Sequence, residues 1–110
     1  MSNDEPILVL CTAPADGDKA AALAAGLVEA RLAACVNLIP GLRSFYRWEG
    51  KVHDDAEVQL LIKTRRGRYD ELERWLSSHH PYDVPEILVL PSGGGARAYL
   101  EWLSEQTQSR

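Results

Sequence analysis

The sequence predicts an α+β domain in which an antiparallel sheet carries its helices on one face. Three observations lead to this class. Short apolar runs alternate with helical patterns, a turn-forming pair separates two long strand-like segments in the middle, and 110 residues is the length of one domain. A chain of this length can bury a core without disulfides or metal ions.

The first two elements are a strand and a helix. Residues 7–12 (ILVLCT) form an unbroken apolar run, which is typical of a strand buried on both faces. Asp16 or Asp18 then offers an N-cap, and apolar residues recur at helical spacing over residues 19–34. Gly26 lies inside this helix, where glycine costs about 1 kcal/mol relative to alanine, so it indicates close packing.

The middle of the chain predicts a long hairpin. Residues 35–39 form a second strand, Pro40 and Gly41 interrupt it as a bend or bulge, and the strand resumes over residues 43–48. Glu49-Gly50 has the composition of a hairpin turn. Residues 52–64 return as a third strand, whose alternating pattern makes one face the apolar one.

The remaining elements are a helix, a strand and a last short helix. Residues 65–78 have a helical pattern that Pro81 ends, residues 86–90 form a fourth strand, and residues 96–104 form the final helix. The order βαββαβ plus a C-terminal helix is the split-βαβ, ferredoxin-like arrangement. One sheet face and the hairpin then stay uncovered, which favours assembly with other chains.

Composition places the chain among ordinary globular proteins. Hydrophobic residues make up 45% and charged residues 25%, unlike a disordered or coiled-coil chain. The net charge of −4 lacks the basic excess of a nucleic-acid binder, and no apolar run approaches the ~20 residues of a membrane helix. The N-terminal residues show no basic segment followed by an apolar core, so we expect no signal peptide. We therefore expect one cytoplasmic domain over residues 1–110, with loose tails at 1–5 and 105–110 and no nucleic-acid or membrane partner.

Connectivity predicts one cluster with metal-binding chemistry. Cys11 stands at the end of the first strand, and His79 and His80 stand at the end of the second helix, which returns to the same end of the sheet. Thiolate and imidazole bind copper, zinc and other late transition metals, and a thiolate favours Cu⁺. A helix N-terminus at Asp16 or Asp18 would lower the pKa of Cys11 and favour the thiolate. The second cysteine, Cys35, is expected to pack in the core.

Ordinary structural roles compete with this hypothesis. Cys11 fits a small buried hydrophobe and His80 fits a helix C-cap. Neighbouring residues on a regular helix point about 100° apart, so His79 and His80 share one ion only if the helix unwinds at Pro81. The basic segment 63–68 (KTRRGR) at a helix start either attracts an anion or is a solvated patch. No nucleophile–base set or nucleotide fingerprint occurs, so the sequence does not predict an enzyme.

Five short motifs follow one another between about residue 7 and residue 103. They are LVLCTAP (8–14), LAACVN (32–37), YRWEGK (46–51), LIKT (61–64) and HHPYDVPE (79–86). Together they resemble the CutA family of divalent-cation tolerance proteins. The loop SGGG (92–95) departs from the family pattern, and we attach no function to it.

The resemblance implies a ferredoxin-like homotrimer related in shape to the PII-type signalling proteins, with sheets packed inward and hairpins paired across subunits. It implies a role in tolerance of copper and other divalent metal cations. The copper ligands it implies are Cys11, His79 and His80, for Cu⁺ or Cu²⁺. A second hypothesis is a PII-like signalling or scaffold trimer that binds a small anion or a partner protein, and it draws on the arginines of residues 65–68.

Overall fold

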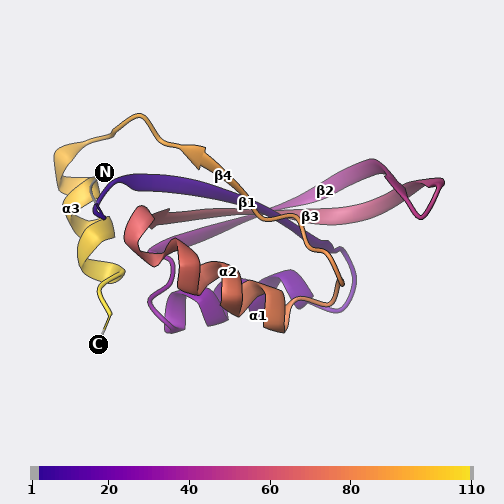
Figure 1. Ribbon diagram of the computed structural model, residues 1–110, viewed down its shortest axis with the longest axis horizontal. Coiled ribbons are helices and arrows are strands. Elements are labelled where there is room, and N and C mark those ends of the chain that lie inside the picture. The colour runs from indigo at the N-terminus through magenta and orange to yellow at the C-terminus, as the bar shows by residue number, and fades with distance from the viewer. Residues whose placement is uncertain (1–2, 110) are drawn as a thin grey trace.

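The computed structural model describes residues 3–109 and contains one four-stranded antiparallel sheet (Figure 1). The strand order is β2-β3-β1-β4, and each neighbouring pair is antiparallel. The predicted ferredoxin-like arrangement is therefore confirmed. The elements are β1 (Pro6–Pro14), α1 (Lys19–Glu29), β2 (Cys35–Trp48), β3 (Lys51–Arg65), a 3-10 turn (Arg66–Arg68), α2 (Tyr69–His79), β4 (Leu88–Pro91) and α3 (Arg97–Gln106).

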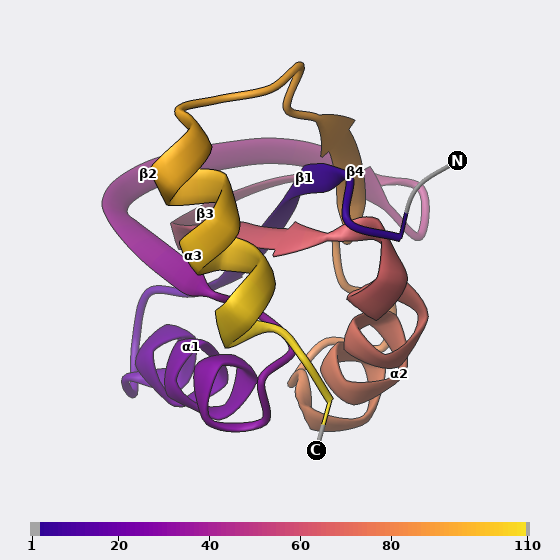
Figure 2. The same ribbon diagram turned by 90° about the vertical axis from the view of Figure 1, so that its left-hand side faces the viewer.

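The helices lie unevenly around the sheet. Figure 2 shows α1 and α2 side by side along one face, while α3 crosses one end of the sheet. The hairpin of β2 and β3 extends from the opposite end and makes the molecule 43 Å long (Figure 1). Within the described residues, no helical layer covers the sheet face turned away from α1 and α2 (Figure 2). None of the helices within residues 3–109 has the length and apolarity needed to cross a lipid bilayer.

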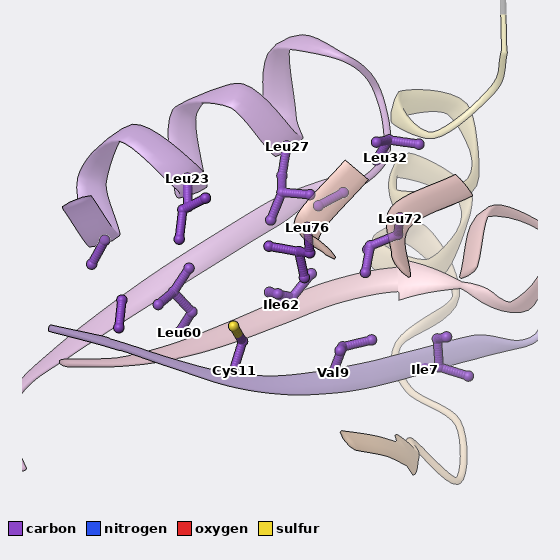
Figure 3. Packing of buried hydrophobic residues seen from close by; sticks show 13 residues of the cluster. Ile7, Val9, Cys11, Leu23, Leu27, Leu32, Leu60, Ile62, Leu72 and Leu76 are labelled. Carbon is purple, nitrogen blue, oxygen red and sulfur yellow. The ribbon is translucent and has the colours of Figure 1, made fainter. Parts of the chain in front are cut away.

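The core fills the space between the sheet and the two long helices (Figure 3). Every second residue of β1 from Ile7 to Ala13 points into it, and none of these residues is more than 1% exposed. Leucines one helical turn apart on α1 and α2 complete the contact, as an amphipathic helix requires. The main core residues are Ile7, Val9, Cys11, Ala13, Leu23, Leu27, Leu60, Ile62, Leu72 and Leu76.

The hairpin has the two irregularities that the sequence predicts. The register between β2 and β3 shifts between Ile39 and Leu42, where Gly41 has a φ of 87°. This is a bulge, which bends the strand and increases its twist. Glu49 and Gly50 both have positive φ, at 50° and 78°, as the tight turn that joins two twisted strands needs.

The first helix is shorter than its apolar pattern predicts. It ends at Glu29 instead of continuing to residue 34, because Arg31 adopts a left-handed conformation with a φ of 61°. The N–H of Leu32 then turns back to donate to the carbonyl of Leu27, closing the helix end. Asp18 precedes the helix with a φ of 53° and makes no side-chain capping bond, so the predicted cap at this residue is wrong.

The fourth strand, Cys35 and the chain ends also differ from what the sequence predicts. The fourth strand begins at Leu88, two residues later than expected. Cys35 is not part of the core, because its register opposite Lys63 puts it on the sheet face turned away from the helices. The C-terminal segment, which was expected to be loose from residue 105, packs against the sheet. Thr107 is fully buried and accepts a hydrogen bond from Arg65 Nε at 3.1 Å, while residues 1, 2 and 110 lie outside the described residues.

Gly26 generates a stability prediction. A Cβ atom at this position would lie 2.5 Å from the Trp75 indole. We expect Gly26→Ala to lower the free energy of unfolding by about 1–3 kcal/mol, because overpacking outweighs the helix propensity of alanine. In a Trp75→Leu background the same change should stabilise the protein by up to about 1 kcal/mol. Urea unfolding at one fixed protein concentration measures both, and stabilisation by Gly26→Ala alone would contradict the packing argument.

Candidate functional site

His80 joins the end of α2 to the end of β1. The residue is 8% exposed, its Nε2 donates to the carbonyl oxygen of Thr12 at 2.8 Å, and its Nδ1 accepts from the N–H of Tyr82 at 3.1 Å. These two bonds require a neutral ring with its proton on Nε2. Both elements therefore finish at the same end of the sheet, as their order predicts. Because both ring nitrogens are engaged, His80 offers no free lone pair in this conformation.

Cys11 is the residue before Thr12, and its side chain belongs to the core. Its sulfur points from β1 towards the helices and lies between Val9 and Leu60 (Figure 3). Burial raises the pKa of the thiol to about 12, and the negative charges of Glu86 and Glu57 add to the effect. The expected lowering of this pKa by the start of α1 is therefore wrong, because the loss of hydration dominates.

The raised pKa of Cys11 also determines how the contribution of this thiol to stability changes with pH. The folded state keeps this thiol protonated, whereas the unfolded chain ionises it near the ordinary value of 9.0. The thiol therefore contributes stability below about pH 9 and loses that contribution as pH rises from 9 towards 12. At neutral pH the side chain is a neutral thiol in the core.

His79 lies on the exposed side of α2. Its ring stacks on Trp75 with centroids 4.0 Å apart and planes 13° apart, and its Nδ1 donates to the carbonyl oxygen of Trp75 at 2.7 Å. Ser78 Oγ also lies 3.0 Å from the same nitrogen. With the proton held on Nδ1, the lone pair of Nε2 stays available to a ligand.

The three predicted ligands are thus only partly brought together. His80 reaches the residue next to Cys11, but the thiol faces the core and His79 lies apart on the helix surface. Among residues 3–109, no three His, Cys, Asp or Glu side chains are arranged to hold one metal ion. The copper site stays a prediction, and it requires a rearrangement at this end of the sheet or donors from another subunit.

A cavity of about 750 Å³ opens at the same end, between the hairpin and the segment that follows α2. Sequence reasoning did not find this cavity, because it forms where the bulged hairpin and a proline-bounded loop meet. The motif HHPYDVPE contains half of its lining, and the hairpin supplies most of the rest. The lining residues are Thr12, Ser44, Phe45, Tyr46, Trp48, Glu57, Pro81, Tyr82, Asp83, Val84, Pro85 and Glu86.

The cavity is negatively charged. Glu57 is 5% exposed and accepts a hydrogen bond from the Tyr82 hydroxyl at 2.7 Å. Burial, followed by this bond to the carboxylate, raises the pKa of Tyr82. A hydrogen bond to Asp55, followed by burial, raises the pKa of Tyr46 in the same way. The lining contains three carboxylates and neither lysine nor arginine, so its surface suits a cation better than an anion.

The basic segment 63–68 lies at the opposite end of the sheet, where its arginines have protein partners. Arg65 donates to the side chain and carbonyl oxygen of Thr107, Arg68 donates to Glu71 and to the carbonyl oxygen of Arg31, and Arg66 lies 3.8 Å from Glu5. These contacts tie the chain ends and α1 to the sheet. The arginines therefore have a structural role, and the anion hypothesis finds no set of free cations in this segment.

Comparisons with known proteins agree on one family. The family model of the CutA1 divalent ion tolerance protein matches residues 7–106. A relative named divalent-cation tolerance protein CutA from Pectobacterium atrosepticum is 51% identical over 100 residues, which cover 91% of this chain and 90% of the relative. The chloroplastic protein CutA of Arabidopsis thaliana is 45% identical, covering 94% of this chain and 56% of the relative. The solved divalent cation tolerance protein of Thermus thermophilus superposes with a TM-score of 0.89 at 48% identity, covering 94% of this chain and 99% of that one.

The state of Cys11 generates a reactivity prediction. In a Cys35→Ser variant, Cys11 is the one remaining thiol. At pH 8 a thiol with a pKa of about 12 is about one ten-thousandth ionised, and its sulfur is buried, so iodoacetamide should modify it only after unfolding. Mass spectrometry with and without denaturant measures this. Rapid alkylation of the native protein would show that the end of β1 opens readily.

Proposed function

Because the chain belongs to the CutA1 family of divalent-ion tolerance proteins, we propose that it acts in divalent-cation tolerance as a homotrimer that binds the cation itself, with copper as the first candidate ion. The candidate ligands are Cys11, His79 and His80. In this role the chain takes up a metal and catalyses no reaction. We also expect it to act in the cytoplasm, although two relatives are named as chloroplastic and one solved neighbour is named as periplasmic.

The observation that carries the metal proposal is the 2.8 Å hydrogen bond between His80 and Thr12. It brings the imidazole of the residue that follows α2 to the residue beside a thiol of β1, so two kinds of soft or borderline donor reach one end of the sheet. Imidazole suits Cu²⁺, which stands at the peak of the divalent affinity order, and thiolate suits Cu⁺. His79 adds an imidazole nitrogen that is already open.

Metal uptake at these residues requires local rearrangement. The thiol of Cys11 must lose its proton and turn from the core, and one ring nitrogen of His80 must give up its hydrogen bond. Both steps cost free energy, and the first releases a proton. Binding should therefore weaken as pH falls, and it should be coupled to movement of the segment that follows α2.

The trimer proposal rests on the uncovered sheet face. Leu10, Leu61 and Leu88 are opposite one another on neighbouring strands and point away from the helices, and Leu88 is 55% exposed. Leu8 and Leu90 extend the same apolar surface. Leaving such a surface in water is unfavourable by about 25 cal/mol per Å². Packing three sheets together would remove it from water and would also protect the open edges of β2 and β4.

The alternative, a PII-like trimer that binds a small anion, is less well supported. The cavity near His80 has carboxylates on its surface, and the arginines of residues 65–68 are engaged with protein groups. The carboxylates of the cavity would repel an anion. At the arginines of residues 65–68, an anion would have to displace the protein groups that these side chains already contact. A role as a scaffold for a partner protein is compatible with the same trimer.

The copper proposal predicts tight binding that depends on its three ligands. We expect stoichiometric binding by the purified protein, measured against a competing chelator with Cu⁺ and with Cu²⁺, and loss of that binding in the Cys11→Ser, His79→Ala, His80→Ala variant. Affinity should fall between pH 8 and pH 5, because the ligands must be deprotonated. A His53→Ala variant is the matched control, since it removes a hairpin imidazole that stacks on Tyr46. Equal binding by the triple variant and wild type would contradict the site.

The trimer proposal predicts a change of mass. We expect light scattering to give three times the 12.2 kDa chain mass for the wild type. Leu61→Glu should give monomers, because it places a charge within the apolar sheet face. Val28→Glu also replaces an aliphatic residue with glutamate, but on the exposed side of α1, and should leave the mass unchanged. A monomeric wild type, or a trimeric Leu61→Glu protein, would be incompatible with assembly through this face.

A further inference from the structure

The three candidate copper ligands differ in what each one needs before it can bind an ion. The thiol of Cys11 must leave the core, and His80 must give up one of its two hydrogen bonds. His79 needs neither change, because its side chain is exposed and its Nε2 makes no hydrogen bond within the described part of the chain. It is therefore the one ligand of the three that an ion in solvent reaches in this conformation.

Trp75, one turn earlier on α2, holds the imidazole of His79 in one orientation and one tautomer. Its carbonyl oxygen accepts from His79 Nδ1 at 2.7 Å, and its indole lies flat against the imidazole with centroids 4.0 Å apart. Metal-binding histidines donate their second ring N–H in this way, because the bond fixes the tautomer and raises the basicity of the ligating nitrogen. The pair therefore already has the arrangement of a metal-binding histidine and the group that supports it.

The indole of Trp75 is itself held in place by α1. Gly26 leaves room for it, since a Cβ atom there would lie 2.5 Å from the ring, and the indole packs against the core. Both helices lie on the sheet face opposite the one proposed for assembly (Figure 2). The trimer therefore leaves this contact between α1 and α2 open to solvent.

We propose that His79 makes the first contact with the metal ion and that Trp75 is the residue that positions it. Nε2 of His79 takes the ion while the core is closed, and Cys11 and His80 join only after the segment that follows α2 moves. This inference rests on the proposed function, because it assumes that the chain takes up a divalent cation. It gives a role in uptake to Trp75, which is not one of the candidate ligands.

The first test is a fluorescence titration with Cu²⁺. In a Trp48→Phe, Trp102→Phe, Cys11→Ser variant, Trp75 is the one remaining tryptophan and the thiol is absent. Cu²⁺ on His79 should quench Trp75, because an ion with an unfilled d shell accepts excitation from an indole that touches its ligand. We expect saturable quenching that Zn²⁺ reverses, since Zn²⁺ has a filled d shell and also binds imidazole. Addition of His79→Ala should remove the quenching.

The second test is the order of contacts. It uses stopped-flow mixing of Cu²⁺ with the Trp48→Phe, Trp102→Phe variant, which keeps all three ligands. Quenching of Trp75 should come first, at a rate proportional to the Cu²⁺ concentration. The near-ultraviolet absorption of a copper-bound Cys11 thiolate should follow at a rate that reaches a plateau, because this step waits for a conformational change.

Three further variants, each made in the Cys11→Ser protein, separate positioning from other effects of the indole. Trp75→Leu removes the ring that stacks on His79 and should weaken Cu²⁺ binding about tenfold in chelator competition, because the ligand loses its fixed orientation. Trp75→Phe keeps an aromatic face there and should restore most of the affinity. Trp102→Leu removes an indole from α3, at the other end of the sheet, and should leave the affinity unchanged (Figure 1).

Three results would overturn the proposal. They are quenching that survives His79→Ala in the Cys11→Ser background, a thiolate signal that precedes the quenching, and a Trp75→Leu variant that binds Cu²⁺ as tightly as the Trp75→Phe variant. Failure of the three-ligand site looks different. Saturable quenching without any later thiolate signal would contradict the role of Cys11 and would still support His79 as the contact that Trp75 positions.

Discussion

The packing of β1 against α1 and α2 is the contact on which the rest of the structure depends. β1 is hydrogen-bonded to both β3 and β4, and its residues Ile7, Val9, Cys11 and Ala13 all point into the core. Its last residues then meet His80 and the cavity, so the same strand positions both the core and the candidate site. A change at the end of β1 therefore affects packing and ligand chemistry together.

Cys11 shows the conflict that follows from this arrangement. As a core residue it is most favourable as a neutral thiol among apolar side chains, whereas a metal ligand must be an accessible thiolate. Both states cannot be optimal in one conformation. A protein that uses this thiol for metal must pass between a closed state, which the core stabilises, and an open state, which the metal stabilises. The hydrogen bonds of His80 belong to the closed state and set part of the cost of opening.

The sequence predicted the architecture because local patterns carry it. The apolar run of β1, the interruption at Pro40 and Gly41, and the turn at Glu49-Gly50 each have a direct structural reason. The end of α1 was missed because Arg31 occupies a left-handed position that usually belongs to glycine. In the candidate site, topology brought His80 to the end of β1. It did not give the direction of the Cys11 side chain, because an unbroken apolar run hides which residues face the helices.

The cavity illustrates why some sites escape pattern reading altogether. Its two walls come from the hairpin beyond the bulge and from the segment between Pro81 and Glu86, and the residues of neither wall are spaced in a way that predicts a cavity. The bulge bends the hairpin, while the two prolines restrict the backbone of the facing segment. Glu57 becomes buried only because these two segments meet. Its burial is therefore a product of tertiary structure, and the hydrogen bond that it accepts from the Tyr82 hydroxyl joins the two segments.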